Sequence, residues 1–462
     1  MSQNEGLNRR AFLRNAGITA LVGATVGTGG SVVEAAARAA LAGTSKFDFD
    51  TPYNRFGTDS VKYDQQIRVF GKDSVQVGMG IADMDFRCAP AITKALTERL
   101  QHENWGYLDM PKSFPDGIIS WNKKRYNIDI NPELLVITTG VHPGLIAALR
   151  AFSPPGSKVL LNTPTYNGFY GDLTYTGTLA EENPLKVVNG RFSIDFEDFE
   201  RRISSETKTF ILCNPQNPTG NCWSPEDLMR LGEICLKHNV VVLADEIHCD
   251  FVTKGHKYTP FASLPNKAVV NNSITFKAAS KSFGLAAMKC AWFFSDNMDY
   301  INRVKANNRA DLTTMGMIAS KAAYAGGEDW LNQCVEYIDA NHDYVESYIK
   351  ANIPMIKMVK PQGTYLTWLD VSAVANKINA KQLAAEASKS QNASMKPLTA
   401  EQMVERHFVK TAKVHMNQGA SYGAGGENHM RMNIATSRKT LELALNNLAS
   451  ALKGGMTSAA IG

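Results

Sequence analysis

The chain has 462 residues, of which 44% are hydrophobic and 20% are charged, a balance that excludes an intrinsically disordered protein. Its formal net charge of +5 is small for this length, and no basic run carries interleaved aromatic residues, so we expect no binding to nucleic acid. Its seven cysteines form neither a CxxC pair nor a cluster with zinc-like spacing, so we expect buried thiols, no disulfide framework and no metal site.

Residues 1–40 have the pattern of an export signal. Residues 8–14 read NRRAFLR, and a short Gly/Ala-rich apolar stretch at 16–33 leads to small residues suited to cleavage. The pair Arg9 and Arg10 before Phe-Leu resembles the bacterial twin-arginine signal. We therefore expect export of the folded protein by the twin-arginine machinery, a periplasmic or other extracytoplasmic location, and no stable membrane insertion after cleavage. A flexible N-terminal tail is the alternative.

Beyond the leader, short β-branched runs alternate with amphipathic stretches. Strands are predicted at 134–138, 158–161, 209–213, 240–244 and 269–276, and helices at 145–152, after a turn at 140–144, and at 225–238. The run at 240–244 is continuously apolar, which is typical of a strand covered on both faces. This alternation predicts an α/β domain with a mostly parallel sheet covered by helices.

After about residue 330 the pattern changes to that of a smaller α+β domain. A helix is predicted at 331–350, a strand at 364–370, a second helix at 401–409, a glycine-rich loop at 419–426, and a polar surface insertion at 376–398. The predicted organisation is a leader at 1–40, an N-terminal part of the small domain at 46–90, a large domain at 91–329 and the rest of the small domain at 330–455.

Two residues at the ends of predicted strands are suited to one cofactor. Asp245 follows the apolar run at 240–244, and Lys281 follows the next predicted strand. Pyridoxal 5′-phosphate (PLP) needs a lysine for its aldehyde, an anion near its pyridine nitrogen, a donor to its phenolic oxygen and a phosphate cup. In open α/β sheets such groups come from loops at the carboxyl ends of strands.

Three motifs carry a resemblance to a known family. Residues 214–220 read NPQNPTG, 245–248 read DEIH and 280–284 read SKSFG. In this order and spacing they resemble the fold-type-I PLP enzymes of the aspartate aminotransferase superfamily, over about residues 47–452. The resemblance implies the type I PLP-dependent transferase fold, PLP as the cofactor and a small amino acid as the substrate.

Within that superfamily the chain is most similar to the cystathionine β-lyase and cysteine-S-conjugate β-lyase branch, the MalY/PatB type. The stretches that carry this similarity are FDF at 47–49, IADMDF at 81–86, WGY at 105–107, TPTYNGFY at 163–170 and DEIH at 245–248.

The resemblance implies a role for each matched residue. Lys281 would bind the cofactor covalently and then remove the Cα proton, and Asp245 would pair with the pyridine nitrogen. Asn217 would hydrogen-bond the phenolic oxygen and lie beside the substrate. Tyr166 would stack on the ring and share in catalysis. Arg431 would clamp the substrate carboxylate in a bidentate pair.

Other matched positions would hold the phosphate. The backbone of Gly140, Val141 and His142, at a turn into a helix, would supply N–H groups. Tyr107 would reach the phosphate of a neighbouring subunit, which implies a homodimer. The remaining candidate cofactor contacts are His248, Ser280 and Lys289.

The chain also departs from the family pattern. Ala278 stands where a phosphate-binding serine is common, so we expect the phosphate contacts to be redistributed, with Lys277 and Lys289 flanking the cup. Asp109 follows Tyr107 closely, where lyases of this branch carry other residues, and an acid there would change the side-chain preference of the substrate site.

The predicted activity is a C–S β-lyase that converts cystathionine or an S-substituted cysteine to pyruvate, ammonia and a thiol. The alternatives are an aminotransferase of a small amino acid, a racemase or other PLP enzyme, and a non-catalytic exported binding protein with the same fold. The complete set of Lys281, Asp245, Asn217 and Arg431 argues against the last of these. These assignments rest on analogy.

Overall fold

The structure of the protein is a computed structural model, which describes residues 46–389, 391 and 395–453. The export signal predicted at 1–40 lies outside these residues and stays a prediction. Within the described part of the chain, no helix combines the length and the apolar character needed to cross a bilayer.

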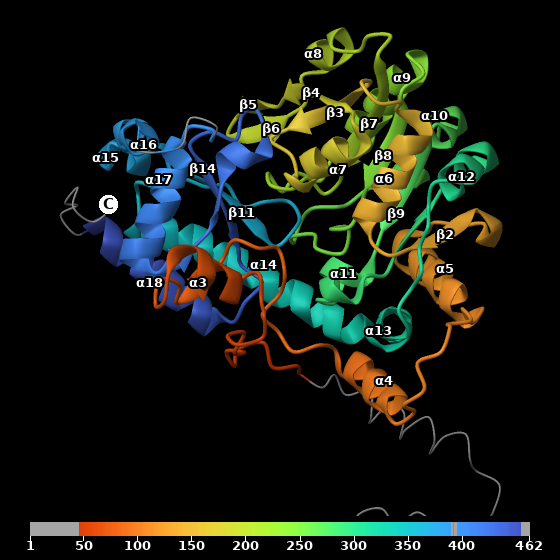
Figure 1. The fold of residues 1–462 in the computed structure, drawn as a ribbon, viewed down its shortest axis with the longest axis horizontal. Helices are drawn as coiled ribbons and strands as arrows, with labels where there is room; N and C mark the ends of the chain where they lie inside the picture. Colours follow the sequence, from red (N-terminus) through yellow and green to blue (C-terminus); the bar gives the residue numbers. More distant parts are fainter. Residues whose placement is uncertain (1–45, 390, 392–394, 454–462) are drawn as a thin grey trace, which may run out of the picture. The chain divides into compact units, whose positions relative to one another are not determined.

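The larger of the sheets has seven strands in the order β2-β10-β9-β8-β7-β3-β4 (Figure 1). Its strands are β2 (Leu135–Thr138), β3 (Lys158–Thr163), β4 (Leu179–Pro184), β7 (Thr207–Cys213), β8 (Val241–Asp245), β9 (Ser273–Lys277) and β10 (Ala291–Phe294). All neighbouring pairs are parallel except those of β10, which runs antiparallel to β2 and β9. The predicted mostly parallel sheet is confirmed.

Helices cover both faces of this sheet. One face packs against α6 (Val141–Phe152), α7 (Gly168–Thr176) and α12 (Met298–Lys305), and the other against α8 (Phe196–Arg201), α9 (Pro225–Lys237) and α10 (Lys267–Asn271). Successive residues of β8 alternate between these faces. Val242 packs on the face that carries α9, and Leu243 packs on the face that carries α6. This double burial explains the unbroken apolar run in the sequence.

Two sequence-based boundaries are wrong. The strand predicted at 269–276 begins only at Ser273, because α10 occupies the first half, where the Asn266 side chain accepts hydrogen bonds from the first backbone N–H groups of the helix. The helix expected to begin after residue 144 already begins at Val141, since Pro143 fits the first turn of a helix without losing a hydrogen bond.

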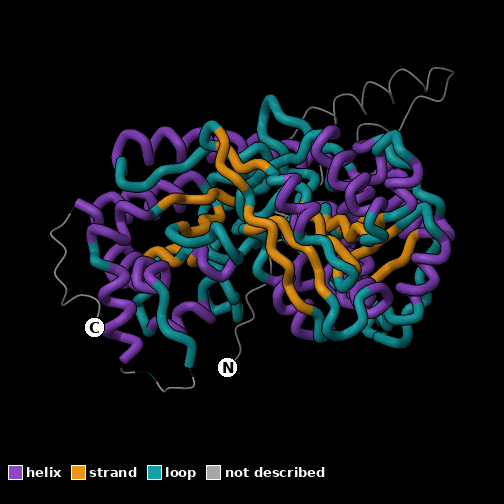
Figure 2. Tube along the Cα trace, turned by 90° about the horizontal axis from the view of Figure 1, so that it is seen from above, coloured by secondary structure: helices purple, strands orange, loops and turns teal. Residues whose placement is uncertain are grey.

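The smaller part of the fold is built around an antiparallel sheet of β11 (Leu366–Asp370), β14 (His429–Asn433) and β13 (Asn417–Gln418). The N-terminal segment joins it through β1 (Val77–Gly78), which pairs in parallel with β12 (Val414–His415). Figure 2 shows the strands enclosed by helices in both parts. The N-terminal segment therefore packs with the C-terminal part, as expected, while the predicted domain boundaries stay a prediction.

The remaining elements surround these sheets. They are α3 (Asp64–Phe70), α4 (Pro90–Leu100), α5 (Ser113–Tyr126), β5 (Lys186–Val188), β6 (Arg191–Ser193), α11 (Ala279–Ser282), α13 (Thr314–Gly326), α14 (Glu328–Asn352), α15 (Ser372–Lys377), α16 (Ala380–Lys389), α17 (Ala400–His407) and α18 (Arg438–Lys453).

The described part of the segment at 376–398 packs against the core, which the prediction of a surface insertion did not include. Its helix α16 lies against α17 and buries Ala380 and Ala384 in the main core cluster. Small alanine side chains let the helix approach closely, while its lysines are exposed, and this explains why the composition alone indicated a surface segment.

Candidate active site

The motifs of the sequence meet at one edge of the large sheet. Asp245 ends β8, Lys281 lies on α11 just after β9, Asn217 lies in the loop after β7, and α6 begins after β2. The carboxyl ends of these strands share that edge, where ligands of open α/β sheets bind. They surround a cavity of about 470 Å³. Its lining residues are Thr139, Gly140, Val141, His142, Pro143, Tyr166, Cys213, Asn217, Asp245, Ile247, His248, Ser280, Lys281, Ala286 and Lys289.

Lys281 is half-buried and aimed at the N-terminal segment. Its Nζ donates a 2.7 Å hydrogen bond to the carbonyl oxygen of Ala82, which also accepts a bond from the Tyr365 hydroxyl. Burial lowers the pKa of Lys281 to about 8, and the positive charge of Arg431 acts in the same direction. The lysine is therefore neutral more often than an ordinary lysine, and the neutral amine is the form that attacks an aldehyde or removes a proton.

Asp245 is a deeply buried carboxylate. Its Oδ1 accepts a 3.2 Å bond from the Ile247 backbone N–H, and among the described residues no lysine or arginine pairs with it. Burial raises the pKa of Asp245 to about 6, against the effect of that backbone hydrogen bond. A buried carboxylate without a cationic partner is costly, and a protonated ring nitrogen would supply the missing charge.

Arg431 and Asn217 form a second buried polar group. Arg431 projects from β14 and is only 2% exposed; its Nη1 donates to Asn217 Oδ1 at 3.0 Å and its Nη2 to the Gly80 carbonyl at 2.7 Å. Its Nε has no partner, and no carboxylate pairs with this guanidinium in the part of the chain that the structure describes. A buried arginine without an acid is suited to a ligand carboxylate.

Tyr166 faces the cavity beside His142. The Tyr166 hydroxyl lies 3.2 Å from His142 Nε2, and both oxygens of the Asp172 carboxylate lie within 2.9 Å of His142 Nδ1. Burial raises the pKa of Tyr166 to about 12, so its phenol is protonated at neutral pH. Asp172 was not among the residues predicted from the sequence.

The predicted phosphate end of the site begins at the N-terminus of α6. Gly140 precedes this twelve-residue helix, and Val141 and His142 are its first residues. The N-terminus of a helix offers free N–H groups and a favourable dipole to an anion. Ser280 and the exposed Lys289 line the same cavity.

Lys277 does not flank this end of the cavity, so that expectation is wrong. Its Nζ lies 3.9 Å from the centre of the Tyr126 ring and 3.5 Å from the Tyr258 hydroxyl. Neighbouring residues of a strand point to opposite faces, and Phe276 packs on the face that carries α6. Lys277 therefore points to the other side of the sheet.

Two further predicted site residues, His248 and Tyr107, differ in their position relative to the cavity. His248 lines the cavity, but it is buried with no partner for Nδ1, and burial holds the pKa of His248 well below its usual value, so its imidazole is neutral. Tyr107 is fully exposed and does not line this cavity. Its role toward a neighbouring subunit stays a prediction.

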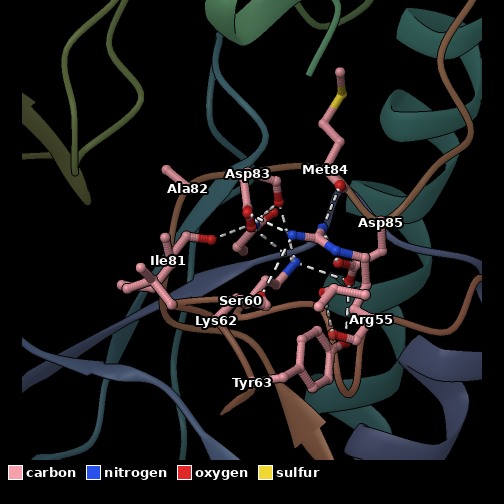
Figure 3. Close-up of polar contacts among 12 residues, drawn as sticks. Arg55, Ser60, Lys62, Tyr63, Ile81, Ala82, Asp83, Met84 and Asp85 are labelled. Carbon is pink, nitrogen blue, oxygen red and sulfur yellow. Dashed lines mark hydrogen bonds and ion pairs between the residues drawn. The ribbon is translucent and has the colours of Figure 1, made fainter. Parts of the chain in front are cut away.

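A buried ion cluster is formed by residues of the N-terminal segment (Figure 3). The fully buried Lys62 donates to Asp85 at 2.8 Å and to the Asp83 carbonyl at 3.1 Å. Arg55 bridges Asp83 and Asp85 at 2.8 and 3.0 Å, and the Tyr63 hydroxyl donates to Asp85 at 3.2 Å. Two cations thus balance two carboxylates, which is the condition for keeping such charges away from water.

This cluster holds a loop whose carbonyl groups reach both functional cations. The Ala82 carbonyl accepts from Lys281, and the Gly80 carbonyl accepts from Arg431. The sequence motif at 81–86 indicated a family but no role, because a backbone carbonyl carries no signal in residue type.

Cys213 is a further residue of the site that the sequence motifs did not indicate. It lines the cavity and its thiol accepts the Asn217 backbone N–H at 3.3 Å, which helps to hold the loop after β7. All seven cysteines lie in the described part and are unpaired. Across the described residues, no group of three or more His, Cys, Asp or Glu side chains is arranged to hold a metal ion.

Residues 74–448 match the family model of class I and II aminotransferases. The chain belongs to this family. It is 36% identical over 412 residues to the cystathionine β-lyase PatB of Bacillus subtilis, a match that covers 88% of this chain and 100% of PatB. It is also 27% identical to the protein MalY of Escherichia coli, over 88% of this chain and 99% of MalY.

Two solved structures that contain PLP are similar to the structure of this chain. Cystalysin from Treponema denticola, which contains a PLP cofactor, has a TM-score of 0.79 and 28% identity, over 88% of this chain and 99% of cystalysin. The PLP-bound C-S lyase from Staphylococcus hominis has a TM-score of 0.76 and 27% identity, over 89% of this chain and 100% of that lyase. The predicted type I PLP-dependent transferase fold is confirmed.

The cavity fits PLP by its own chemistry. It offers a lysine with a lowered pKa, a buried carboxylate without a cation, and the free N–H groups of a helix N-terminus. An aldehyde, a protonated ring nitrogen and a phosphate match these three features in turn.

Proposed function

We propose that this protein is a PLP-dependent C–S β-lyase that converts cystathionine or an S-substituted cysteine to pyruvate, ammonia and a thiol. The observation that carries the proposal is that Lys281, Asp245 and Asn217 line one cavity and that Arg431 donates to Asn217. Asp245 and Arg431 are buried, and neither forms an ion pair in the described part of the chain. The names of PatB and of the similar C-S lyase structure support β-elimination.

Different residues of the site would contact different parts of the cofactor. Lys281 would bind its aldehyde carbon, Asp245 its ring nitrogen and the amide nitrogen of Asn217 its phenolic oxygen, since the Asn217 Oδ1 already accepts from Arg431. The start of α6 would hold the phosphate. When bound, PLP withdraws electrons from the substrate Cα and so makes loss of its proton possible.

The chain itself handles the substrate. Arg431 binds the amino-acid carboxylate and fixes the orientation of Cα. Lys281 then removes the Cα proton as a neutral amine, the form that its lowered pKa favours. The Ala82 carbonyl offers the resulting ammonium a hydrogen-bond acceptor at its present position.

Transamination is the second candidate, favoured by one departure from the lyase pattern, the acidic Asp109 close to Tyr107. The two reactions differ in their need for a second substrate. Incubated with cystathionine or an S-substituted cysteine and no 2-oxo acid, a lyase releases pyruvate and thiol over many turnovers. A transaminase stops after about one turnover, because its cofactor retains the amino group until a 2-oxo acid arrives. Arrest with every sulfur amino acid, relieved by 2-oxoglutarate, would establish the second candidate instead.

We propose further that the enzyme is a homodimer in which Tyr107 reaches the neighbouring site. Tyr107 is wholly exposed in the single chain, and the exposed Trp105 and Met110 lie close to it in sequence, as in a surface that a partner covers. Light scattering on the purified protein should give twice the chain mass. Tyr107→Phe should weaken PLP binding, and a monomer with full cofactor affinity would contradict this arrangement.

We propose also that the folded protein is exported through the twin-arginine route. The support is the order of NRRAFLR, a short apolar stretch and small residues at the start of the chain. Replacement of Arg9 and Arg10 by lysine should leave the folded precursor in the cytoplasm. Export of that double variant at the normal level would contradict the proposal.

A further inference from the structure

Three side chains from three parts of the sequence form a continuous hydrogen-bonded row at the cavity. His142 in the first turn of α6 contacts Tyr166 in the loop after β3 through Nε2, and Asp172 on α7 through Nδ1. The Asp172 side chain is 5% exposed, whereas that of His142 is 43% exposed. The row therefore runs from a buried carboxylate, through an imidazole that water can reach, to a phenol in the cavity.

The helix α7 is built to allow this row. Gly168 and Asp172 are four residues apart and lie on the same face of the helix. A Cβ atom on Gly168 would come within 2.6 Å of the Tyr166 ring and 2.7 Å of the His142 ring. The absence of a side chain at this position lets both rings approach the helix, and Asp172 then meets His142 one turn later.

The charge of His142 is set by its surroundings. Burial and the nearby Lys281 act to lower the pKa of His142, but the hydrogen bond and charge of Asp172, with a contribution from Asp245, outweigh them and raise it. The first turn of a helix also disfavours a cation. The positive charge of His142 thus depends on Asp172, the one acid that contacts it directly among the described residues.

The protonation state of His142 decides where the phenol proton of Tyr166 points. A neutral imidazole with its Nδ1–H on Asp172 accepts the phenol proton at Nε2. A protonated imidazole donates from Nε2 to the phenol oxygen instead, so the phenol hydrogen is free to point into the cavity. Only the second arrangement makes Tyr166 a proton donor to a bound molecule.

We propose that Asp172, His142 and Tyr166 form a proton relay that delivers a proton to the sulfur atom leaving the substrate. This inference rests on the proposed β-lyase function. As the Cβ–S bond breaks, its electron pair stays on sulfur and takes the Tyr166 proton, so a neutral thiol departs. The electrons of the former Cα–H bond, whose proton Lys281 has taken, form the Cα=Cβ bond.

The relay then returns to its starting state. His142 passes its Nε2 proton to the Tyr166 oxygen and becomes neutral, and its Nε2 then regains a proton from the solvent that reaches this partly exposed imidazole. Tyr166 is therefore the catalytic acid, and His142 and Asp172 are positioning residues that act through it. A relay of this kind matters most for alkyl thiolates, which are strong bases and poor leaving groups, and least for leaving groups that depart as stable anions.

The test compares leaving groups in variants loaded with cofactor. His142→Gln and Asp172→Asn should lower kcat for pyruvate release from cystathionine about a hundredfold, the low end of what general acid catalysis contributes. The same variants should lose less than about threefold with β-chloroalanine, whose chloride needs no proton. S-aryl cysteines with electron-poor rings should fall between. His238→Gln is the matched control, because that imidazole pairs with Glu200 away from the cavity.

A pH profile and a spectrum separate the relay from a structural role. Because the relay needs the imidazolium, kcat for cystathionine should fall as the pH rises through the raised pKa of His142, and Asp172→Asn should move this fall to lower pH. Nitrogen-15 NMR titration of labelled histidine in the purified protein should show a pKa of His142 above the ordinary value for histidine, and a lower pKa in Asp172→Asn. A pKa of His142 that is no higher in the unmodified protein than in Asp172→Asn would overturn the relay.

The outcomes distinguish the relay from the function on which it rests. Equal losses with all three kinds of substrate, in variants that fold and bind PLP, would overturn the relay while leaving the lyase intact. Failure of the unmodified protein to release pyruvate from cystathionine and S-aryl cysteines would overturn the proposed function and the relay together. A loss confined to the poor leaving groups would support both.

Discussion

Lys281 donates a 2.7 Å hydrogen bond to the backbone carbonyl of Ala82, 199 residues earlier in the chain. Ala82 belongs to the loop that the Arg55, Lys62, Asp83 and Asp85 cluster holds in place. The lysine that is expected to bind the cofactor therefore has a defined acceptor when it is free. That acceptor is supplied by the N-terminal segment and not by the large sheet.

The first prediction is that PLP binds covalently to Lys281. The purified protein should be yellow, and borohydride reduction should attach PLP to the peptide that contains Lys281, because this amine faces the cavity with a lowered pKa. Mass spectrometry of the digested protein locates the label. Lys289→Ala should keep the label at Lys281, although it removes the other lysine that lines the cavity. A label on any other lysine would refute the assignment.

The second prediction is that Asp245→Asn changes the free energy of unfolding in opposite directions with and without the cofactor. In the free protein the pKa of Asp245 is raised to about 6, so the folded state binds this proton more tightly than the unfolded chain does. The unmodified protein therefore loses up to about 3 kcal/mol of stability as the pH rises from 4 through 6, and Asp245→Asn avoids this loss.

Urea unfolding at pH 7.5 measures both effects of this substitution. Without PLP the Asn variant should be the more stable protein, and with PLP it should be the less stable one, because the ring nitrogen has lost its counter-ion. Asp129→Asn, at an exposed carboxylate, is the control and should change neither value. The same sign of change in both states would contradict the proposed pairing.

The third prediction concerns Arg431 and the substrate carboxylate. Arg431→Lys should raise KM for the amino acid about tenfold to a hundredfold, because lysine keeps the charge but loses the two parallel donors. Steady-state kinetics measures this, and an amino-acid amide, which lacks the carboxylate, should show a much smaller difference between the two proteins. Equal KM values for the acid would mean that Arg431 serves only to hold Asn217 and Gly80.

The fourth prediction is that the buried ion cluster stabilises the N-terminal segment. Lys62→Met should lower the free energy of unfolding by about 3 kcal/mol, because it leaves the buried Asp85 with one cation fewer. Lys94→Met, which removes an exposed pair with Glu98, should cost less than about 0.5 kcal/mol. Denaturant unfolding compares the two, and equal losses would show that burial of the cluster does not matter.

The sequence by itself determined the central part of the site. Asp245, Lys281 and Asn217 could be placed because each follows a predicted strand, and the carboxyl ends of parallel strands meet at one edge of a sheet. The strand β8 was recognisable because both of its faces are buried, so its residues up to Ala244 are all apolar. Periodicity and loop motifs report burial and turn geometry, which are local properties.

Only the tertiary structure decided the long-range partners. Arg431 reaches the Gly80 carbonyl, 351 residues away, and Lys281 reaches that of Ala82, and neither acceptor has a signature because every residue carries a carbonyl group. The acid beside His142 could not be chosen from the sequence, since the packing of α7 against α6 selects Asp172. Lys277 points away from the cavity because the pleat of β9 fixes its side of the sheet, whereas Lys281 lies beyond the strand on α11 and lines the cavity.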